Sequence, residues 1–173
     1  MSSTPDAKNK HDIDIRNMEI DDISAVYHLG ERLFTSEGYP ILYRTWDPYE
    51  VTDAFTSDPN YCFVAEMENE GDIVGFALAT TIEKEGTAWK KYGYISWIGV
   101  DGLFQRSNLG QRLYRRLEER FRKDGVRMII ADTDEDNKGA IAFFKAMDFS
   151  HSSNHVWLTK TMRRPVKKKD KQA

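Results

Sequence analysis

Residues 94–111 read YISWIGVDGLFQRSNLGQ and pass from an apolar segment through a short polar one into a second apolar pattern. The first part, Tyr94–Val100, is rich in aromatic and β-branched residues, which is typical of a strand. Beyond the polar part, apolar residues recur at helical spacing and predict a helix over residues 110–123. The apolar stripe of that helix comprises Leu109, Leu113, Leu117 and Phe121. The sequence therefore predicts a strand that leads into a helix through one polar loop.

That polar loop has the features of an anion site. The first N–H groups of a helix lack an intrahelical acceptor, and the helix dipole adds partial positive charge there. Asn108 tolerates a positive φ, and Gly110 allows close approach to the backbone. Arg106 and Arg112 add positive charge beside them. Polar strand-to-helix turns that bind nothing are also common, so the loop alone leaves both interpretations open. P-loop and Rossmann folds have no support, because G-x-x-x-x-G-K-[ST] and G-x-G-x-x-G are absent.

Strands and helices alternate on both sides of this segment. A first strand is expected at Ile13–Ile15, a first helix from Ile20 to near Gly38, and a second helix that starts at Asp47-Pro48 and stops before Asp58. The remaining strands are expected at residues 61–65, 73–79, 92–100, 126–131 (buried) and 155–161, and the last helix at 137–147.

The order of these elements determines the fold class. Strand–helix–strand passages predict parallel neighbours, and hairpins predict antiparallel ones. We therefore expect a mixed, mostly antiparallel α/β sheet of about six or seven strands with helices on both faces.

Length and composition indicate one soluble domain. The chain has 173 residues, a usual domain size. No apolar run approaches the roughly 20 residues of a membrane span, and the N-terminus has no signal-like segment, so a cytoplasmic protein with no membrane partner is expected. Cys62 is the only cysteine and the four histidines are scattered, so neither disulfides nor a metal site are predicted.

The net charge of −3 is unevenly distributed. Residues 163–173 carry six Lys or Arg and one Asp, a local charge of +5, which leaves −8 on the remaining chain. Such a body does not favour nucleic acid. We expect a disordered tail at residues 1–11, a domain at 12–162 and a solvated basic tail at 163–173.

Two motifs at the expected distance resemble those of the GNAT acetyltransferases. Gln105-x-x-Asn108-x-Gly110 is similar to the family's acyl-CoA motif [Arg/Gln]-x-x-Gly-x-[Gly/Ala], and residues 137–149 resemble its Asn-x-x-Ala…Phe-Tyr-x-x-x-Gly-Phe helix. In this chain Asn108 and Asp148 replace glycines of the two motifs, and Phe144 replaces the tyrosine that often protonates the departing thiolate. The resemblance spans residues 12–162.

The resemblance implies an acetyl-CoA-dependent N-acetyltransferase of the EC 2.3.1 type. The sheet would part between the fourth and fifth strands, and the cofactor arm would lie in the opening. The implied acetyl-CoA contacts are Ile98, Gly99, Val100, Gln105, Arg106, Ser107, Asn108, Leu109, Gly110, Gln111, Asn137 and Phe144. The acceptor is a primary amine of a small molecule or a protein, and a homodimer is a possible assembly.

Catalytic residues are less well defined by the sequence. An N–H of the bulged fourth strand would stabilise the developing oxyanion, and Tyr94 and Ser96 lie on that strand. The carboxylates that could act as a base through water are Glu83, Glu85, Asp132 and Asp134, with solvated charges as the alternative. Tyr39, Tyr43 and Trp46 are expected to wall the acceptor pocket. The missing acid at Phe144 and the lack of a carboxylate on the fourth strand leave a second hypothesis open, a non-catalytic acyl-CoA-binding or regulatory module.

Overall fold

The computed structural model describes residues 13–35, 45–154 and the single positions 156, 158, 160 and 162. The chain divides into two compact units, Met1–Asp134 and Glu135–Ala173. The predicted tails at residues 1–11 and 163–173 lie outside the described residues.

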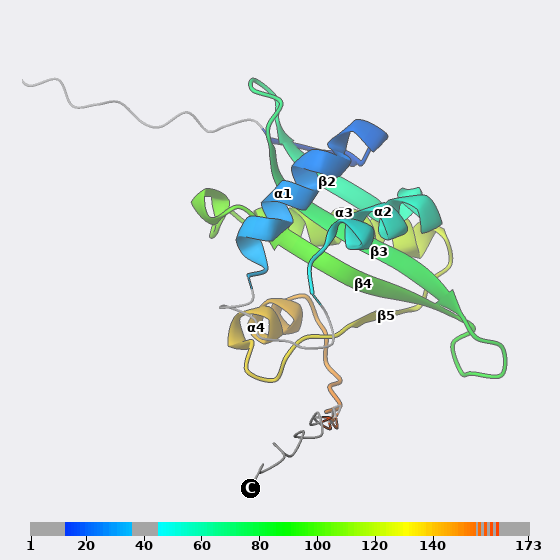
Figure 1. Cartoon of the computed structure of the whole chain (residues 1–173). Coiled ribbons are helices and arrows are strands. Elements are labelled where there is room, and N and C mark those ends of the chain that lie inside the picture. Colours follow the sequence, from blue (N-terminus) through cyan, green and yellow to red (C-terminus); the bar gives the residue numbers. More distant parts are fainter. Residues whose placement is uncertain are drawn as a thin grey trace, which may run out of the picture. The chain divides into compact units, whose positions relative to one another are not determined.

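The first unit is built on one sheet with strand order β1-β2-β3-β4-β5 (Figure 1). The first four strands are antiparallel to their neighbours, and β5 is parallel to β4. The strands are β1 (Ile13–Asn17), β2 (Cys62–Met67), β3 (Ile73–Glu83), β4 (Lys91–Val100) and β5 (Met128–Ala131). The mixed, mostly antiparallel sheet predicted from the sequence is thus confirmed.

The strand count differs from the prediction. The described residues form five strands, whereas six or seven were expected. The difference lies at the predicted last strand, residues 155–161, which falls largely outside the described residues, and its described positions are not in a strand.

Local chemistry explains the start of α2 and the end of α3. The helices are η1 (Ile20–Asp22), α1 (Ile23–Leu33), α2 (Pro48–Ser57), η2 (Pro59–Tyr61), η3 (Gly102–Phe104), α3 (Leu109–Lys123) and α4 (Lys138–Ala146). At the start of α2 the Asp47 side chain accepts hydrogen bonds from the N–H groups of Tyr49 and Glu50, as the Asp-Pro start predicts. After α3 the chain reverses at Gly125, whose φ is 77°. Helix α1 ends at Leu33, earlier than the expected Gly38.

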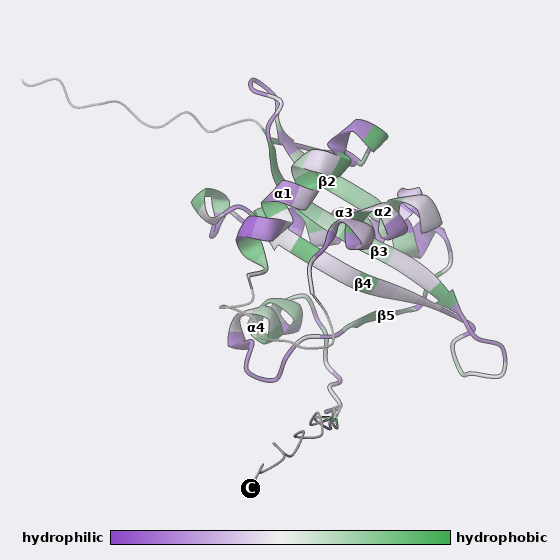
Figure 2. Cartoon of the chain, in the orientation of Figure 1, coloured by the Kyte–Doolittle hydropathy of each residue, from purple (hydrophilic) through white to green (hydrophobic). Residues whose placement is uncertain are grey.

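Helices cover both faces of the sheet (Figure 1). Helices α1 and α2 pack on one face, and their apolar residues join Cys62, Val64, Phe76 and Leu78 in a buried cluster. Helix α3 packs on the other face, where its predicted stripe (Leu109, Leu113, Leu117 and Phe121) is at most 1% exposed. Hydrophilic residues gather on the outer turns of the helices and at the turn between β2 and β3 (Figure 2).

Strand β5 is more exposed than predicted. The run Met128-Ile129-Ile130 is typical of a strand buried on both faces, yet Met128 is 37% and Ile130 40% exposed. The reason is position: among the described strands, β5 has a neighbour only in β4.

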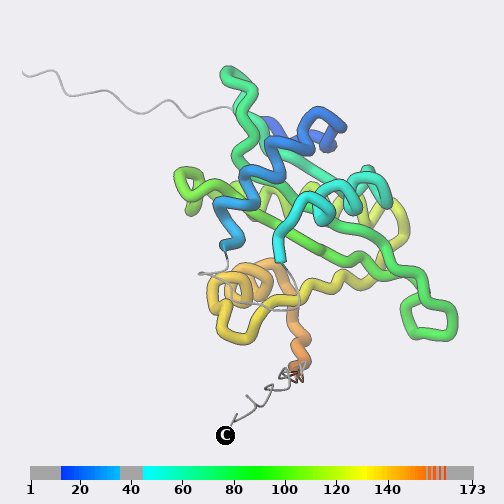
Figure 3. Tube along the Cα trace, in the orientation of Figure 1, coloured from blue at the N-terminus to red at the C-terminus, as the bar shows by residue number. Residues whose placement is uncertain are grey.

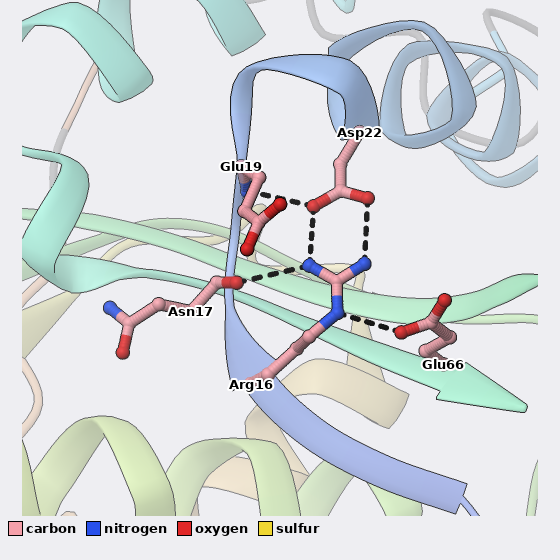
Figure 4. A network of polar contacts seen from close by, with 5 residues as sticks. All are labelled: Arg16, Asn17, Glu19, Asp22 and Glu66. Carbon is pink, nitrogen blue, oxygen red and sulfur yellow. Dashed lines mark hydrogen bonds and ion pairs between the residues drawn. The ribbon is translucent and has the colours of Figure 1, made fainter. Parts of the chain in front are cut away.

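A polar network holds the other edge of the sheet (Figure 4). The guanidinium of Arg16 on β1 donates to both carboxylate oxygens of Asp22, at 2.7 and 2.9 Å, and to Glu66 on β2 at 2.7 Å. The N–H of Glu19 donates to Asp22 at 2.7 Å. Burial alone would raise the pKa of Asp22, but the hydrogen bonds from Arg16 and Glu19 lower it overall.

Candidate active site

Strand β4 has different neighbours along its length. Its first half, residues 92–95, pairs with β3 on one side and with Met128–Ala131 on the other. Strand β5 ends at Ala131, whereas β4 continues beside β3 alone to Val100. The predicted parting of the fourth and fifth strands is therefore present.

A bulge separates these two halves of β4. Trp97 lies opposite Leu78 and Ile95 opposite Ala79, so Ser96 is an extra residue on β4. A one-residue shift turns the following side chains to the other face of a sheet. A Cβ built at Gly93 would meet the Phe121 ring of α3, whereas one built at Gly99 would meet Leu33 of α1. The structure thus contains the bulged strand that the family resemblance implied.

Two predicted catalytic candidates meet where the strands part. The hydroxyl of Tyr94 donates to Oδ1 of Asp132 at 2.6 Å. Tyr94 is half-buried on β4, and Asp132 is exposed just beyond the end of β5. A carboxylate in this place can accept a proton from an amine, directly or through the phenol.

Two other base candidates lie far from this point. Glu83 lies opposite Lys91, at the beginning of β4, with its carboxylate 3.7 Å from the Lys91 ammonium. Ser96 lies five positions further along β4 than Lys91, a distance of roughly 16 Å. Glu85 belongs to the loop that projects beyond the ends of β3 and β4 (Figure 3). Asp134 lies two residues after Asp132 and is half-buried.

The loop between β4 and α3 has the backbone expected of an anion site. Figure 3 traces the chain from β4 through this loop and α3 back to β5. Arg106 and Asn108 have φ of 69° and 62°, so Asn108 adopts the left-handed conformation predicted for it. Its side chain does not cap α3. The first hydrogen bond into the helix runs from Arg112 N–H to the Asn108 carbonyl, so the three N–H groups of residues 109–111 precede the helical ladder.

The side chains around this loop have distinct partners. Asp101 accepts from the Leu103 N–H at 3.0 Å and lies 3.4 Å from the Arg32 guanidinium, which fixes the start of the loop. The Arg106 side chain is exposed. Arg112 instead donates to the Ile13 carbonyl at 2.7 Å, so its guanidinium is directed to β1. The exposed backbone turn with one arginine is compatible with a pyrophosphate.

Helix α4 of the second unit carries the other predicted cofactor residues. The Asn137 side chain accepts from the Ala140 N–H at 3.0 Å and so caps the helix. The ring of Phe144 packs between Phe143 and Phe149, with centroids 5.2 and 5.0 Å away. Asp148, which stands where the family often has glycine, has a φ of 66°.

The expected acceptor-pocket residues are only partly described. Tyr39 and Tyr43 lie outside the described residues. Trp46 is half-buried, donates its indole N–H to the Tyr27 carbonyl at 2.9 Å and packs on Phe34 and Phe76. Its surroundings are those of an aromatic cluster beneath α1 and α2.

One residue of this cluster was missed by the sequence analysis. Glu50 of α2 accepts a 2.5 Å hydrogen bond from the Trp97 indole, just after the bulge. In the sequence, Glu50 is marked only by its position next to the apolar Val51 in the predicted helix. Its hydrogen bond to Trp97 joins residues 47 positions apart, and no local sequence pattern predicts such a contact.

Other features of the described residues do not add a site. A shallow concavity of about 480 Å³ on α2 contains none of the predicted cofactor residues, and its lining is Asp47, Tyr49, Glu50, Thr52, Asp53 and Thr56. Within the described part of the chain, no cluster of histidine, cysteine and carboxylate side chains could hold a metal ion, and no helix is long and apolar enough to cross a membrane. Burial raises the pKa of the Cys62 thiol to about 12, as expected of an inert core cysteine.

Comparison with known proteins agrees with this geometry. A model of the acetyltransferase (GNAT) family matches residues 24–149, and the chain belongs to that family. The [ribosomal protein bS18]-alanine N-acetyltransferase of Escherichia coli strain K12 is 26% identical over 139 residues, which cover 80% of this chain and 82% of that protein.

Solved structures share the fold. An acetyltransferase of Trypanosoma brucei superposes with a TM-score of 0.65 at 21% identity, covering 86% of this chain and 100% of the other. AAC(6')-Iy in complex with a CoA-containing bisubstrate analogue gives 0.63 at 19% identity, covering 87% and 99%. The chain is thus an acetyl-CoA-dependent N-acetyltransferase of the EC 2.3.1 type, with acetyl-CoA as its co-substrate.

Proposed function

We propose that the enzyme acetylates the N-terminal α-amine of a protein, at the point where β4 leaves β5. The observation that carries this proposal is the Tyr94–Asp132 hydrogen bond of 2.6 Å at that point. An α-amine has a pKa of about 8 and a lysine amine about 10.4, so a single exposed carboxylate suits the first acceptor better. The relative that acetylates an alanine of ribosomal protein bS18 supports the same acceptor class.

The donor side of the proposed site is mostly backbone. The pantetheine arm would pair with residues 98–100 of β4, on the edge that β5 leaves unpaired. The pyrophosphate would be bound by N–H groups in the loop of residues 105–111, where Arg106 and Asn108 are left-handed and the helix dipole adds positive charge. Acetyl-CoA would supply the activated thioester. In the second unit, Asn137 would contact the cofactor and Phe144 would pack beside its thiol end, as the family resemblance implies.

The bulge suits the chemical step. The strand is bulged at Ser96, and in this arrangement an N–H of the bulged strand would donate to the carbonyl oxygen of the thioester. Such a donor stabilises the negative charge that develops on that oxygen during attack. Holding the thioester and the amine side by side would supply much of the remaining acceleration.

The proton and the leaving group have separate destinations. The neutral amine forms the new C–N bond, the C–S bond breaks, and the amine proton passes to Asp132, through Tyr94 or a water molecule. A thiol with a pKa near 8.5 leaves readily as thiolate, so the phenylalanine at position 144 is compatible with turnover. Ser96 is the alternative side chain for the proton transfer.

The same proposal covers the acceptor side of the site, the partners of the enzyme and its assembly. Trp46, with Tyr39 and Tyr43, would line the acceptor side. The body charge of −8 argues against a nucleic-acid partner, and we expect a cytoplasmic enzyme that can form a homodimer. Light scattering of the purified protein would measure its assembly.

A panel of acceptors tests the proposed function. Peptides with a free N-terminus, the same peptides N-blocked but carrying lysine, and an aminoglycoside would be incubated with acetyl-CoA, and products identified by mass spectrometry. We expect acetylation of the free N-termini. Acetylation of only lysine or the aminoglycoside would overturn the acceptor class, and thermal stabilisation by acetyl-CoA without any turnover would favour the non-catalytic module.

A further inference from the structure

The side chain of Trp97 joins the bulge to helix α2. Its indole Nε1 donates to Oε2 of Glu50 at 2.5 Å. Its ring packs on Phe34, with centroids 4.7 Å apart, and edge-on to Trp46 at 5.1 Å. Trp97 and Glu50 are both half-buried. The side chain of Trp97, the first residue after the bulge, is therefore fixed both by the packing of its ring and by the hydrogen bond of its only polar side-chain atom.

Glu50 is a well-fixed acceptor. It lies in the first turn of α2, where an acidic side chain is favoured by the helix dipole. Its own N–H and that of Tyr49 are held by the Asp47 side chain at 3.2 and 2.7 Å. A hydrogen bond to a carboxylate is stronger than one between neutral groups, and partial burial strengthens it further.

The bulged register depends on where Trp97 points. In an unbulged strand the Trp97 side chain would share the face of Gly93, which packs against α3. The indole instead lies among Phe34, Trp46 and Glu50 on the α1 and α2 face. Removing the bulge would draw Trp97 out of this cluster and break its hydrogen bond. The hydrogen bond to Glu50 thus stabilises the bulged register over the regular one.

We infer that Glu50 is a positioning residue: through Trp97 it holds β4 in the bulged register that presents residues 98–100 to the acetyl-CoA arm. This inference rests on the proposed placement of the reaction at this half of β4. Glu50 itself touches neither substrate in this arrangement. It fixes the strand whose backbone does.

Kinetics of four variants test the inference, with whichever amine the wild-type enzyme acetylates best. Trp97→Phe keeps an aromatic side chain but loses the indole N–H, and Glu50→Ala removes the hydrogen-bond acceptor. Each should lower kcat roughly tenfold, the usual effect of one charged hydrogen bond. Glu50→Gln keeps an oxygen that can accept from the indole and should restore most of kcat. The double variant Glu50→Ala/Trp97→Phe should be no slower than either single variant, because both remove the same bond.

Asp53→Ala is the matched control. Asp53 is an exposed carboxylate one turn further along α2, and its substitution removes the same charge without touching Trp97. We expect unchanged kcat and KM. If Glu50→Gln and Asp53→Ala instead raise the KM of the acceptor equally, α2 attracts the amine by charge and the positioning role is wrong. Additive losses in the double variant would also overturn it.

A spectroscopic readout separates this inference from the proposed function. In amide NMR spectra of the full chain, Glu50→Ala should shift the Trp97 indole resonance and the backbone resonances of Ser96 and Ile98, and Asp53→Ala should leave them in place. That comparison needs no acceptor, so it holds or fails independently of the acceptor panel. Unshifted Ser96 and Ile98 resonances in Glu50→Ala would refute the inference even in an active enzyme.

Discussion

The two halves of β4 belong to one strand but differ in their neighbours and in the face that each presents to the helices. Residues 92–95 are paired on both sides, and their face at Gly93 is filled by the Phe121 ring of α3. Residues 97–100 pair with β3 only, among the described strands, and Trp97 and Gly99 face α1 and α2. One extra residue, Ser96, separates the halves. The first half is held in the sheet on both sides, and the second half is where we propose that acetyl-CoA binds.

The difference shows how a sheet can be both rigid and reactive. An unpaired strand edge is usually a liability. Here β5 pairs with residues 92–95 of β4 and then ends, so among the described strands the unpaired edge is only a few residues long and continues into the loop before α3. Substitutions in the first half should therefore change stability, and those around the second half should change binding or turnover.

The largest expected effect is at the proposed phosphate loop. Gly110→Asp places a carboxylate at the start of α3, where the phosphates of acetyl-CoA would lie, and like charges brought together cost several kcal/mol. We expect the Kd for acetyl-CoA to rise at least about 100-fold, measured by calorimetry. Gly110→Ala is the control for size. Unchanged binding in Gly110→Asp, with the fold intact, would contradict the loop assignment.

The next largest effect is at the proposed base. Asp132→Asn should lower kcat/KM roughly 100-fold at neutral pH. The loss should shrink above about pH 8, where the α-amine is already neutral. Stopped-flow or thiol-release kinetics against pH would measure this.

Glu83→Gln is the matched control for Asp132→Asn, because Glu83 lies at the other end of β4. Its kcat/KM should remain that of the wild type. A larger loss in Glu83→Gln than in Asp132→Asn would place the base at the beginning of β4, away from the Tyr94–Asp132 pair, and would contradict the proposed base.

Alanine substitution of one glycine in each half of β4, Gly93 and Gly99, compares the two halves directly. A Cβ at Gly93 would lie 2.8–2.9 Å from three Phe121 ring atoms, and that ring is 1% exposed. Gly93→Ala should therefore lower the free energy of unfolding by about 1–3 kcal/mol. At Gly99 the nearest atom is the Leu33 Cδ1, also at 2.8 Å. Leu33 is half-buried and its methyl can move, so Gly99→Ala should cost less stability.

Denaturant unfolding and acetyl-CoA titration of both glycine variants separate the roles. We expect Gly99→Ala to weaken acetyl-CoA binding more than Gly93→Ala does. The opposite order would mean that the first half of β4 binds the cofactor.

The smallest effect is on the pH dependence of stability. The pKa of Asp22 is lowered in the folded state, so its charged form favours folding: the contribution is present above about pH 4 and is lost as pH falls through the folded-state pKa. Asp22→Ala should lower the free energy of unfolding by about 1–2 kcal/mol at pH 7, and in acid the stability of the variant should approach that of the wild type. Calorimetry from pH 7 to pH 3 measures this, and kcat at pH 7 should not change. A difference in stability between wild type and Asp22→Ala that stays constant from pH 7 to pH 3 would show that the charge of Asp22 is not the source of the stabilisation.

Local chemistry explains which features could be predicted from the sequence. The Asp47-Pro48 helix start, the buried stripe of α3 and the left-handed Asn108 each depend on residues a few positions apart. The bulge at Ser96 and the Glu50–Trp97 bond depend on pairing between distant segments, which no local pattern encodes. The exposure of Met128 and Ile130 was missed for the same reason, because three consecutive apolar residues do not reveal how many neighbours a strand has.

The most direct test of the central claim is an amide NMR titration of the full chain with acetyl-CoA. We predict that resonances of residues 97–100 and 105–111 shift or broaden on binding, while those of residues 91–95 stay in place. Shifts confined to residues 91–95, or to α2, would contradict the assignment of the donor site to the second half of β4 and the loop that follows it.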